Sequence, residues 1–435
     1  MTDPMGVMAD GGDRRSSGPR RPGGAIAKPG GVIDLARRLS PSARRLIACR
    51  AARSIGQGAL VVDFALYLHA LGWSAFQIGL VYSAGLLGGA GLTLLSGPLS
   101  DRVGRKPFII GYSVIQALAA LAALYSGRPA WLVPAAVAGA FGRGANGAAG
   151  PFGPVEQAWL SADLAPTDFG GIYSLNSAVG LSGMAGGALL AGLPALWRGW
   201  LPGALAYRPL FLLVLGGALI PLVLLPGIVD RHGPLAVRPG HTVRCESRDP
   251  RGERGMLLRL MGINTLNGLA IGMIGPFMAL WFQIRFGEGP ATIAPVMGVG
   301  FLLGALGALG TGWLTRQLGT VRSVVAMRLA GLVLLVLLPL APSYPLAAAC
   351  YALRGACNRG TSGARQAVGL ALVGPGRRGL AASLNSVSMQ IPRSLGPIVG
   401  GLFLDADLLV LPLLLAAALQ AAYLALYEMT FREVA

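Results

Sequence analysis

Long runs of apolar residues, separated by short polar links, account for most of this chain. About twelve of these runs are long enough for an α-helix to cross roughly 30 Å of hydrocarbon. They lie at 46–70, 76–97, 107–126, 130–158, 170–193, 208–227, 257–283, 290–314, 321–341, 344–371, 379–404 and 407–430. The pattern predicts an all-α membrane protein with 12 transmembrane helices.

Two polar segments are too long to be simple links. Residues 1–45 are rich in Gly, Pro, Arg and Ser without an apolar period, which predicts a disordered tail. This tail also lacks the apolar core and cleavage site of a signal peptide. Residues 228–256 form the long internal link, and they separate a first half, 46–227, from a second half, 257–435. Each half holds six of the predicted helices.

Short sequences recur between the two halves in the same order and at nearly constant spacing. One of the three recurring pairs is degraded, because Arg316 in the second half stands where the first half has Asp101. The paired segments are 174–177 with 383–386, 143–145 with 354–356, and 97–107 with 312–319. This recurrence indicates a duplicated unit, and so two pseudo-symmetric six-helix bundles.

Composition agrees with a membrane protein and limits the possible partners. Hydrophobic residues make up 54% and charged residues 12% of the chain, with a mean hydropathy of +0.61. A soluble domain carries about twice that charged fraction. The net charge of +18 resides in the links rather than on a basic stripe with stacking aromatics, so we expect no nucleic-acid partner.

The position of the basic residues predicts the orientation. If the N-terminus faces the cytoplasm, most arginines fall on the cytoplasmic side, in the tail, the central link and the links near 102–106, 316–322 and 377–378. We therefore expect a multi-pass protein of the cell (inner or plasma) membrane, with both termini cytoplasmic. We expect it to act as a monomer in the lipid bilayer.

No residue pattern indicates an enzyme, a metal site or a bound cofactor. The cysteines have neither metal spacing nor a disulfide framework, and the three histidines have no accompanying nucleophile. The glycines are spread through the apolar runs as packing residues, so a phosphate-binding loop is not expected. The cysteines are Cys49, Cys245, Cys350 and Cys357.

The link Gly97-Pro-Leu-Ser-Asp-Arg-Val-Gly-Arg-Lys-Pro107 is the most specific motif. It resembles the cytoplasmic turn between helices 2 and 3 of the major facilitator superfamily. The resemblance implies that Asp101 latches the cytoplasmic gate against the start of helix 11, while Arg102 and Arg105 hold the turn at the membrane interface. The remaining residues of the motif are Gly97, Gly104 and Lys106. Simple anchoring of the topology is the alternative.

Arg143 opens a second motif, Arg-Gly-Ala-Asn-Gly-Ala-Ala. It resembles helix 4 of proton-coupled members, in particular the 12-helix drug/proton antiporter branch, although Asn146 replaces the usual glutamine. Counting at about 1.5 Å per residue places Arg143 roughly 20 Å deep, where an unpaired arginine costs at least about 2.5 kcal/mol. Asp63, in the first helix, is the expected partner and the expected site of proton coupling. A structural ion pair is the alternative, and we expect Glu156 to be solvated or paired with a loop.

Arginines of the second half suggest another function. Arg354 and Arg393 are predicted at mid-depth, and the two spans that carry them contain no acid. A positive cavity would suit an anionic substrate, whereas packing against carbonyl groups is the alternative. Further candidates to line the substrate cavity are Asn146, Asn176 and Asn385.

Taken with the resemblance, these patterns favour a secondary transporter that works by alternating access. We expect proton-coupled efflux of a small organic molecule, driven by the proton gradient without a cofactor. The family's antiporters tend to carry Gly-Pro-x-x-Gly-Gly in helix 5, but here the intact run is 396–401 in the eleventh segment, which leaves the direction open. The alternatives are uptake or exchange of an organic anion, and a membrane sensor or scaffold that transports nothing.

Overall fold

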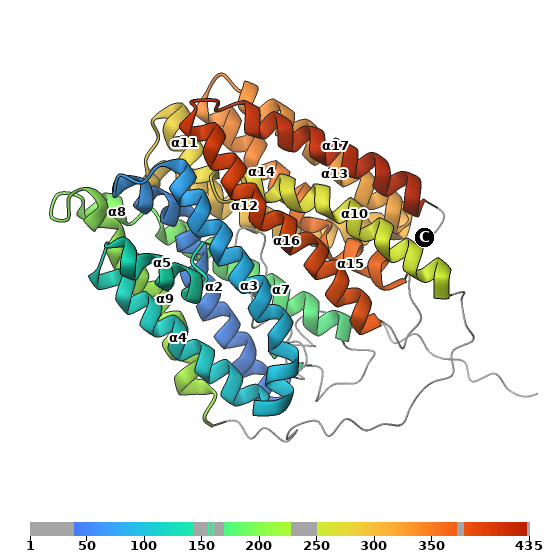
Figure 1. Ribbon diagram of the computed structural model, residues 1–435, viewed down its shortest axis with the longest axis horizontal. Helices are drawn as coiled ribbons and strands as arrows, with labels where there is room; N and C mark the ends of the chain where they lie inside the picture. Colours follow the sequence, from blue (N-terminus) through green and yellow to red (C-terminus); the bar gives the residue numbers. More distant parts are fainter. Residues whose placement is uncertain are drawn as a thin grey trace, which may run out of the picture. The chain divides into compact units, whose positions relative to one another are not determined.

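The computed structural model describes residues 39–142, 153, 155–156, 159–160, 169–227, 250–371 and 378–432. All regular secondary structure in these residues is helical (Figure 1). Eight helices of this part are long and apolar enough to cross a membrane.

The helices of the first half follow the predicted order. They are α2 (Pro41–Ala70), α3 (Ala75–Val103), α4 (Arg105–Tyr125), α5 (Pro129–Gly139), α7 (Phe169–Leu190), α8 (Pro194–Trp197), the 3₁₀ helix η3 (Gly203–Leu210) and α9 (Phe211–Leu224).

The second half follows the same plan. Its helices are α10 (Pro250–Ile274), α11 (Met278–Phe286), α12 (Pro290–Leu318), α13 (Thr320–Leu340), α14 (Tyr344–Gly360), α15 (Ser362–Ala371), α16 (Arg378–Asp405) and α17 (Leu411–Phe431).

Every predicted membrane segment contains helix, but three of the segments are interrupted. The segment 257–283 breaks into α10 and α11, and the segment 344–371 breaks into α14 and α15 at Thr361. The predicted helix 130–158 unwinds at 140–142, where Ala140 and Gly142 adopt positive φ angles of 62° and 68°. Glycines at 139 and 142 weaken the helix there, and hydropathy alone does not detect such a break.

Local sequence explains where the first helices begin. The Ser40 side chain accepts a hydrogen bond from Ala43 N at 3.2 Å, and Pro41 occupies the first turn of α2. The first helix therefore begins five residues before the segment that hydropathy indicates. At α3, Ser74 and Gln77 form a reciprocal capping box.

One glycine makes the turn between α3 and α4, and another makes the turn between α12 and α13. Gly104 has φ 99° and ψ 148°, and Gly319 has φ 81° and ψ 165°. Each glycine N–H donates to the residue four positions earlier, Ser100 or Thr315. Side chains other than glycine rarely adopt this backbone conformation. The turn predicted at 97–107 is thus one residue long, since α3 continues to Val103, and the same turn recurs in the second half.

Glycines also set the closest helix contacts within each half. In the first half Gly58 and Gly187 bring α2 and α7 together, through Met184 and Ile55. In the second half Gly272 and Gly396 do the same for α10 and α16. A Cβ atom at any of these glycines would collide with backbone of the facing helix. The two pairs occupy equivalent places in the two bundles, as the repeat predicts.

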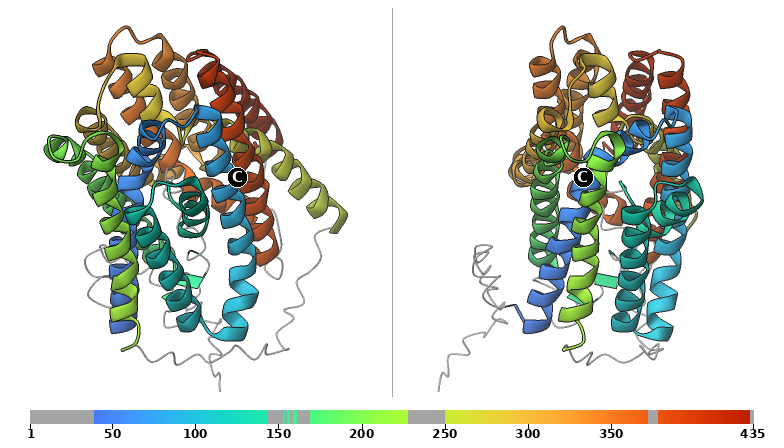
Figure 2. Two further views of the ribbon diagram at one scale, coloured as in Figure 1. Left: turned by 60° about the vertical axis from the view of Figure 1, so that its left-hand side comes forward. Right: turned by 90° about the vertical axis from the view of Figure 1, so that its left-hand side faces the viewer.

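The two halves meet mainly through α3 with α16 and α7 with α12. Figure 2 shows α3 (light blue) beside α16 (red). Close contacts occur where Gly79 faces the Pro397 carbonyl and Gly401 faces Ala75. The intact Gly-Pro run of α16 therefore packs against α10 and α3. We call the end that carries the α2–α3 link the outer end, because the charge distribution predicts that it faces away from the cytoplasm.

Candidate functional site

Asp63 lies on α2 in the interior of the first half. Its relative exposure is 1%, and neither carboxylate oxygen has a hydrogen-bond partner among the described residues. Tyr207 of η3, Tyr82 of α3 and Arg198 lie close enough to act on it electrostatically. A buried carboxyl group with so few partners is expected to bind a proton readily, because its ionised form has lost its hydration.

Phe64, the residue after Asp63 on α2, belongs to a cluster of aromatic side chains. The Phe64 ring makes edge contacts with the Tyr82 and Phe141 rings, with centroids 5.7 Å apart in both pairs. Phe141 also lies 5.2 Å from Phe211. The Phe141 ring of the unwound segment 140–142 is therefore held against Phe64, the residue that follows Asp63 on α2. Arg143 follows the segment directly in the chain.

Arg143 and Asn146 themselves lie outside the described residues, so the predicted Asp63–Arg143 pair stays a prediction. The depth calculated for Arg143 assumed a continuous helix from residue 130, and the break at 140–142 removes that assumption. Irregular backbone at membrane depth must be buried in protein or line a cavity. This break is one feature that the sequence analysis missed, although Gly139 and Gly142 signal it.

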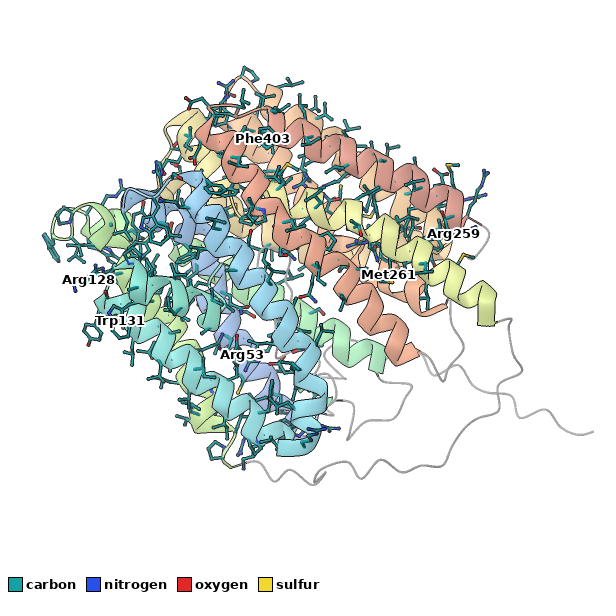
Figure 3. All side chains as sticks on the ribbon, viewed as in Figure 1. Arg53, Arg128, Trp131, Arg259, Met261 and Phe403 are labelled. Carbon is teal, nitrogen blue, oxygen red and sulfur yellow. The ribbon has the colours of Figure 1, made fainter. Side chains whose placement is uncertain are left out.

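A buried ion pair joins Arg53 on α2 to Glu156 (Figure 3 labels Arg53). The two side chains are only 5% and 2% exposed. The expectation that Glu156 is solvated or loop-paired was therefore wrong, because the partner is an arginine on another membrane helix. Arg53 also lines a pocket between α2, α4, α5 and α9. Its other lining residues are Gln57, Leu60, Gln116, Gly139, Ala140, Phe141, Gly142 and Val214.

The gate motif occupies the end of α3 and the start of α4. Arg102 is exposed, Arg105 is buried, and Lys106 Nζ donates to the Pro226 carbonyl at 2.8 Å, which ties the turn to the end of α9. Gly97 and Asp101 are part of α3, but the Asp101 side chain lies outside the described set. The Asp101 latch is therefore still a prediction.

The remaining predicted cavity residues lie on α7, α14 and α16. Asn176 is buried on α7 and Arg393 is buried on α16, whereas Arg354 on α14 is partly exposed. Asn385 lies on α16 with a side chain outside the described set. Asn176 belongs to the first bundle, whereas Arg354, Arg393 and Asn385 belong to the second.

The sequence analysis missed a charged side chain in the middle of the second half. Arg328 lies on α13 and is 3% exposed. Its Nη2 donates to Asn267 Oδ1 of α10, and its guanidinium lies 4.8 Å from the centroid of the Tyr423 ring. The available signal was an arginine inside the apolar segment 321–341.

A polar contact across the outer end was missed as well. Asp405, the last residue of α16, accepts hydrogen bonds from Ala75 N at 2.7 Å and Phe76 N at 2.9 Å, at the start of α3. A carboxylate is unfavourable at the C-terminus of its own helix but favourable at the N-terminus of another. This contact therefore links the two halves and stabilises their approach at the outer end.

Comparison with known proteins places this fold in a family. The model of the Major Facilitator Superfamily matches residues 46–397. None of the curated proteins compared with the chain matches it in sequence. Among solved structures, a mutant form of the nucleoside transporter NupG is similar with a TM-score of 0.72 at 12% identity, covering 89% of this chain and 99% of that chain.

Two further structures are similar over nearly their whole length. A bacterial homologue of the iron transporter ferroportin, in an inward-facing state, has a TM-score of 0.67 at 18% identity, with 89% and 98% coverage of the two chains. A bacterial homologue of the human lysosomal transporter Spinster has a TM-score of 0.66 at 18% identity, with 90% and 96% coverage. At these identities the likeness concerns the fold.

Proposed function

Since the chain belongs to the major facilitator superfamily and is a multi-pass secondary transporter rather than an enzyme, we propose that it couples transport of a small organic molecule to proton movement. Asp63 is the proton-carrying group of this proposal. The observation that supports it is a buried carboxyl group with no hydrogen-bond partner for either oxygen in the described part of the chain.

The surroundings of Asp63 suit a group that gains and loses a proton. Burial favours the neutral form, whereas a positive charge brought nearby favours the ionised form. Arg198 lies within electrostatic range of Asp63, and its Nη2 donates to the Tyr207 hydroxyl at 3.4 Å. Arg143 follows the segment whose Phe141 ring contacts Phe64. Movement of that segment during the transport cycle would change the charge that Asp63 meets.

We propose export as the direction, as in the drug/proton antiporter branch that the helix-4 motif resembles. Tyr207 and Arg198 belong to the outer side of the first half, so protons would reach Asp63 from that side. The proposed setting is the cell membrane, with both termini in the cytoplasm and Asp101 as the cytoplasmic latch. The second candidate function, transport of an organic anion, is favoured by the buried arginines of the second half.

The test is proton movement in proteoliposomes. Purified protein would be reconstituted with a pH-sensitive dye inside, and cationic, neutral and anionic lipophilic compounds would be added in turn. We expect at least one compound to move protons with the unaltered protein and none to do so with Asp63→Asn. The matched control is Asp407→Asn, because Asp407 is exposed and its φ of 57° is one that asparagine tolerates. Proton movement that persists in Asp63→Asn would contradict the proposal.

A further inference from the structure

Arg328 is held inside the second half by neutral groups. It lies among α10, α13 and α17, where Asn267 Oδ1 accepts its hydrogen bond and the Tyr423 ring lies beneath its guanidinium. The Tyr427 ring lies beside the Tyr423 ring, with centroids 5.6 Å apart and planes tilted by 33°. An amide and an aromatic ring orient a guanidinium, but they do not neutralise its charge.

Two more arginines lie within electrostatic range of Arg328. They are Arg354 of α14 and Arg365 of α15, and both helices pack against α13. The Nε atom of Arg354 and the Nε and Nη1 atoms of Arg365 are buried without hydrogen-bond partners among the described residues. Three guanidinium groups therefore lie in one part of the second half, and buried donors of two of them, Arg354 and Arg365, have no described acceptor.

The second half contains few acids that could balance them. Glu428, in the last turn of α17, is exposed. Between residues 254 and 404, Glu288 is the only acidic residue, and it accepts a hydrogen bond from Thr292 at the outer start of α12. Uncompensated charges inside a membrane protein are costly, and they are usually found facing a partner or a water-filled path.

Arg359, on the same helix as Arg354, shows what a purely structural arginine looks like here. Its Nη1 donates to the Gly300 carbonyl at 2.8 Å, its Nη2 donates to the Tyr351 hydroxyl at 3.3 Å, and its guanidinium lies 4.4 Å from the Phe301 ring centroid. Its donors are used within the protein. The buried donors of Arg354 and Arg365 are not used in this way.

We propose that Arg354 and Arg365 bind a small anion bearing a carboxylate or phosphate group, with Arg328 held behind them by Asn267 as a fixed positive charge. Guanidinium groups suit this ligand because they donate paired hydrogen bonds to both kinds of oxyanion. Such a site would make the substrate of the transporter an anion. That role in transport rests on the proposed function. Binding itself does not depend on proton coupling.

Thermal unfolding of the full-length protein in neutral detergent tests the proposal. Inorganic phosphate, succinate and citrate would be titrated against sodium chloride of equal ionic strength. We expect a saturable rise in Tm with at least one of these anions. The anion concentration needed should increase roughly tenfold or more in Arg354→Gln and in Arg365→Gln. Arg322→Gln should respond like the unaltered protein, because Arg322 is exposed on the same helix as Arg328.

Further measurements distinguish a soluble anion from a lipid headgroup, and they test the anion site independently of proton coupling. Stabilisation by phosphatidylglycerol in nanodiscs, lost in the same two variants but absent with soluble anions, would assign the site to a lipid headgroup. Asp63→Asn should keep the anion response while losing proton movement, so the two proposals fail separately. If no probe stabilises the protein, or if Arg354→Gln and Arg365→Gln respond as the unaltered protein does, the proposal is wrong.

Discussion

In the first half of the molecule the buried guanidinium of Arg53 is paired with the carboxylate of Glu156, whereas in the second half the buried guanidinium of Arg328 meets an amide and an aromatic ring. Both halves use the same single-glycine turn and equivalent glycine contacts between helices. The comparison shows which features the two halves share and which they do not. Backbone conformation and packing repeat between the halves, while the buried charges do not.

Asp63 adds a further contrast within the first half. Glu156 has an arginine partner, but the two Asp63 oxygens have none among the described residues. Glu156 is thus suited to stabilise the bundle, and Asp63 is suited to gain and lose a proton. The following predictions test these differences in order of decreasing free energy.

Glu156→Gln should cause the largest loss of stability. Removing one member of a buried ion pair leaves an uncompensated charge and costs about 3–5 kcal/mol. Thermal unfolding in detergent should show a clear fall in Tm, and the double variant Arg53→Leu/Glu156→Leu should regain much of it. Arg328→Gln should cost less, because its partners are neutral. If Arg328→Gln lowers Tm as much as Glu156→Gln does, the proposed contrast between the two halves is wrong.

Gly104→Ala and Gly319→Ala should be destabilising by similar amounts. Both glycines have positive φ with extended ψ, a conformation that costs other residues roughly 1–3 kcal/mol. The measurement is again Tm in detergent. Gly111→Ala is the control, because a Cβ there meets nothing within 4 Å and its φ is not positive, so this variant should be neutral or stabilising. A fall in Tm in only one of the two variants, Gly104→Ala or Gly319→Ala, would contradict the structural repeat.

Asp405→Asn should shift the molecule toward an open outer end. Loss of a charged acceptor at a helix N-terminus is worth about 1 kcal/mol, or roughly a fivefold change in the conformational equilibrium. Spin labels at Ala70 and Leu408, both exposed, would report the separation of the two halves at this end. We expect a larger population at long distance in Asp405→Asn than in Asp407→Asn. Equal distance distributions in the two variants would show that the Asp405 contact does not hold the outer end closed.

Asp63→Asn should leave stability unchanged or slightly raised. The variant removes a buried acid without breaking an ion pair of the described residues. The same thermal assay distinguishes the two interpretations of this residue. A fall in Tm comparable to that of Glu156→Gln would show that Asp63 is a member of a structural ion pair and not a coupling site.

The helices, the glycine turns and the repeat could be predicted from the sequence, because hydropathy and glycine act over a few neighbouring residues. Gly104 and Gly319 each terminate a helix from their own backbone preference. The Asp63 carboxyl group could also be selected in advance, since an acid inside an apolar run is rare for the same local reason.

Only the tertiary structure decided which buried groups meet. Asp405 caps a helix that begins 330 residues earlier, and Glu156 finds Arg53 on α2 rather than solvent. The cluster around Arg328 draws on α10, α13, α14, α15 and α17. Such contacts depend on the order of helices around each bundle and on the rotation of each helix about its axis. Those are properties of the packed assembly, and no short stretch of sequence carries them.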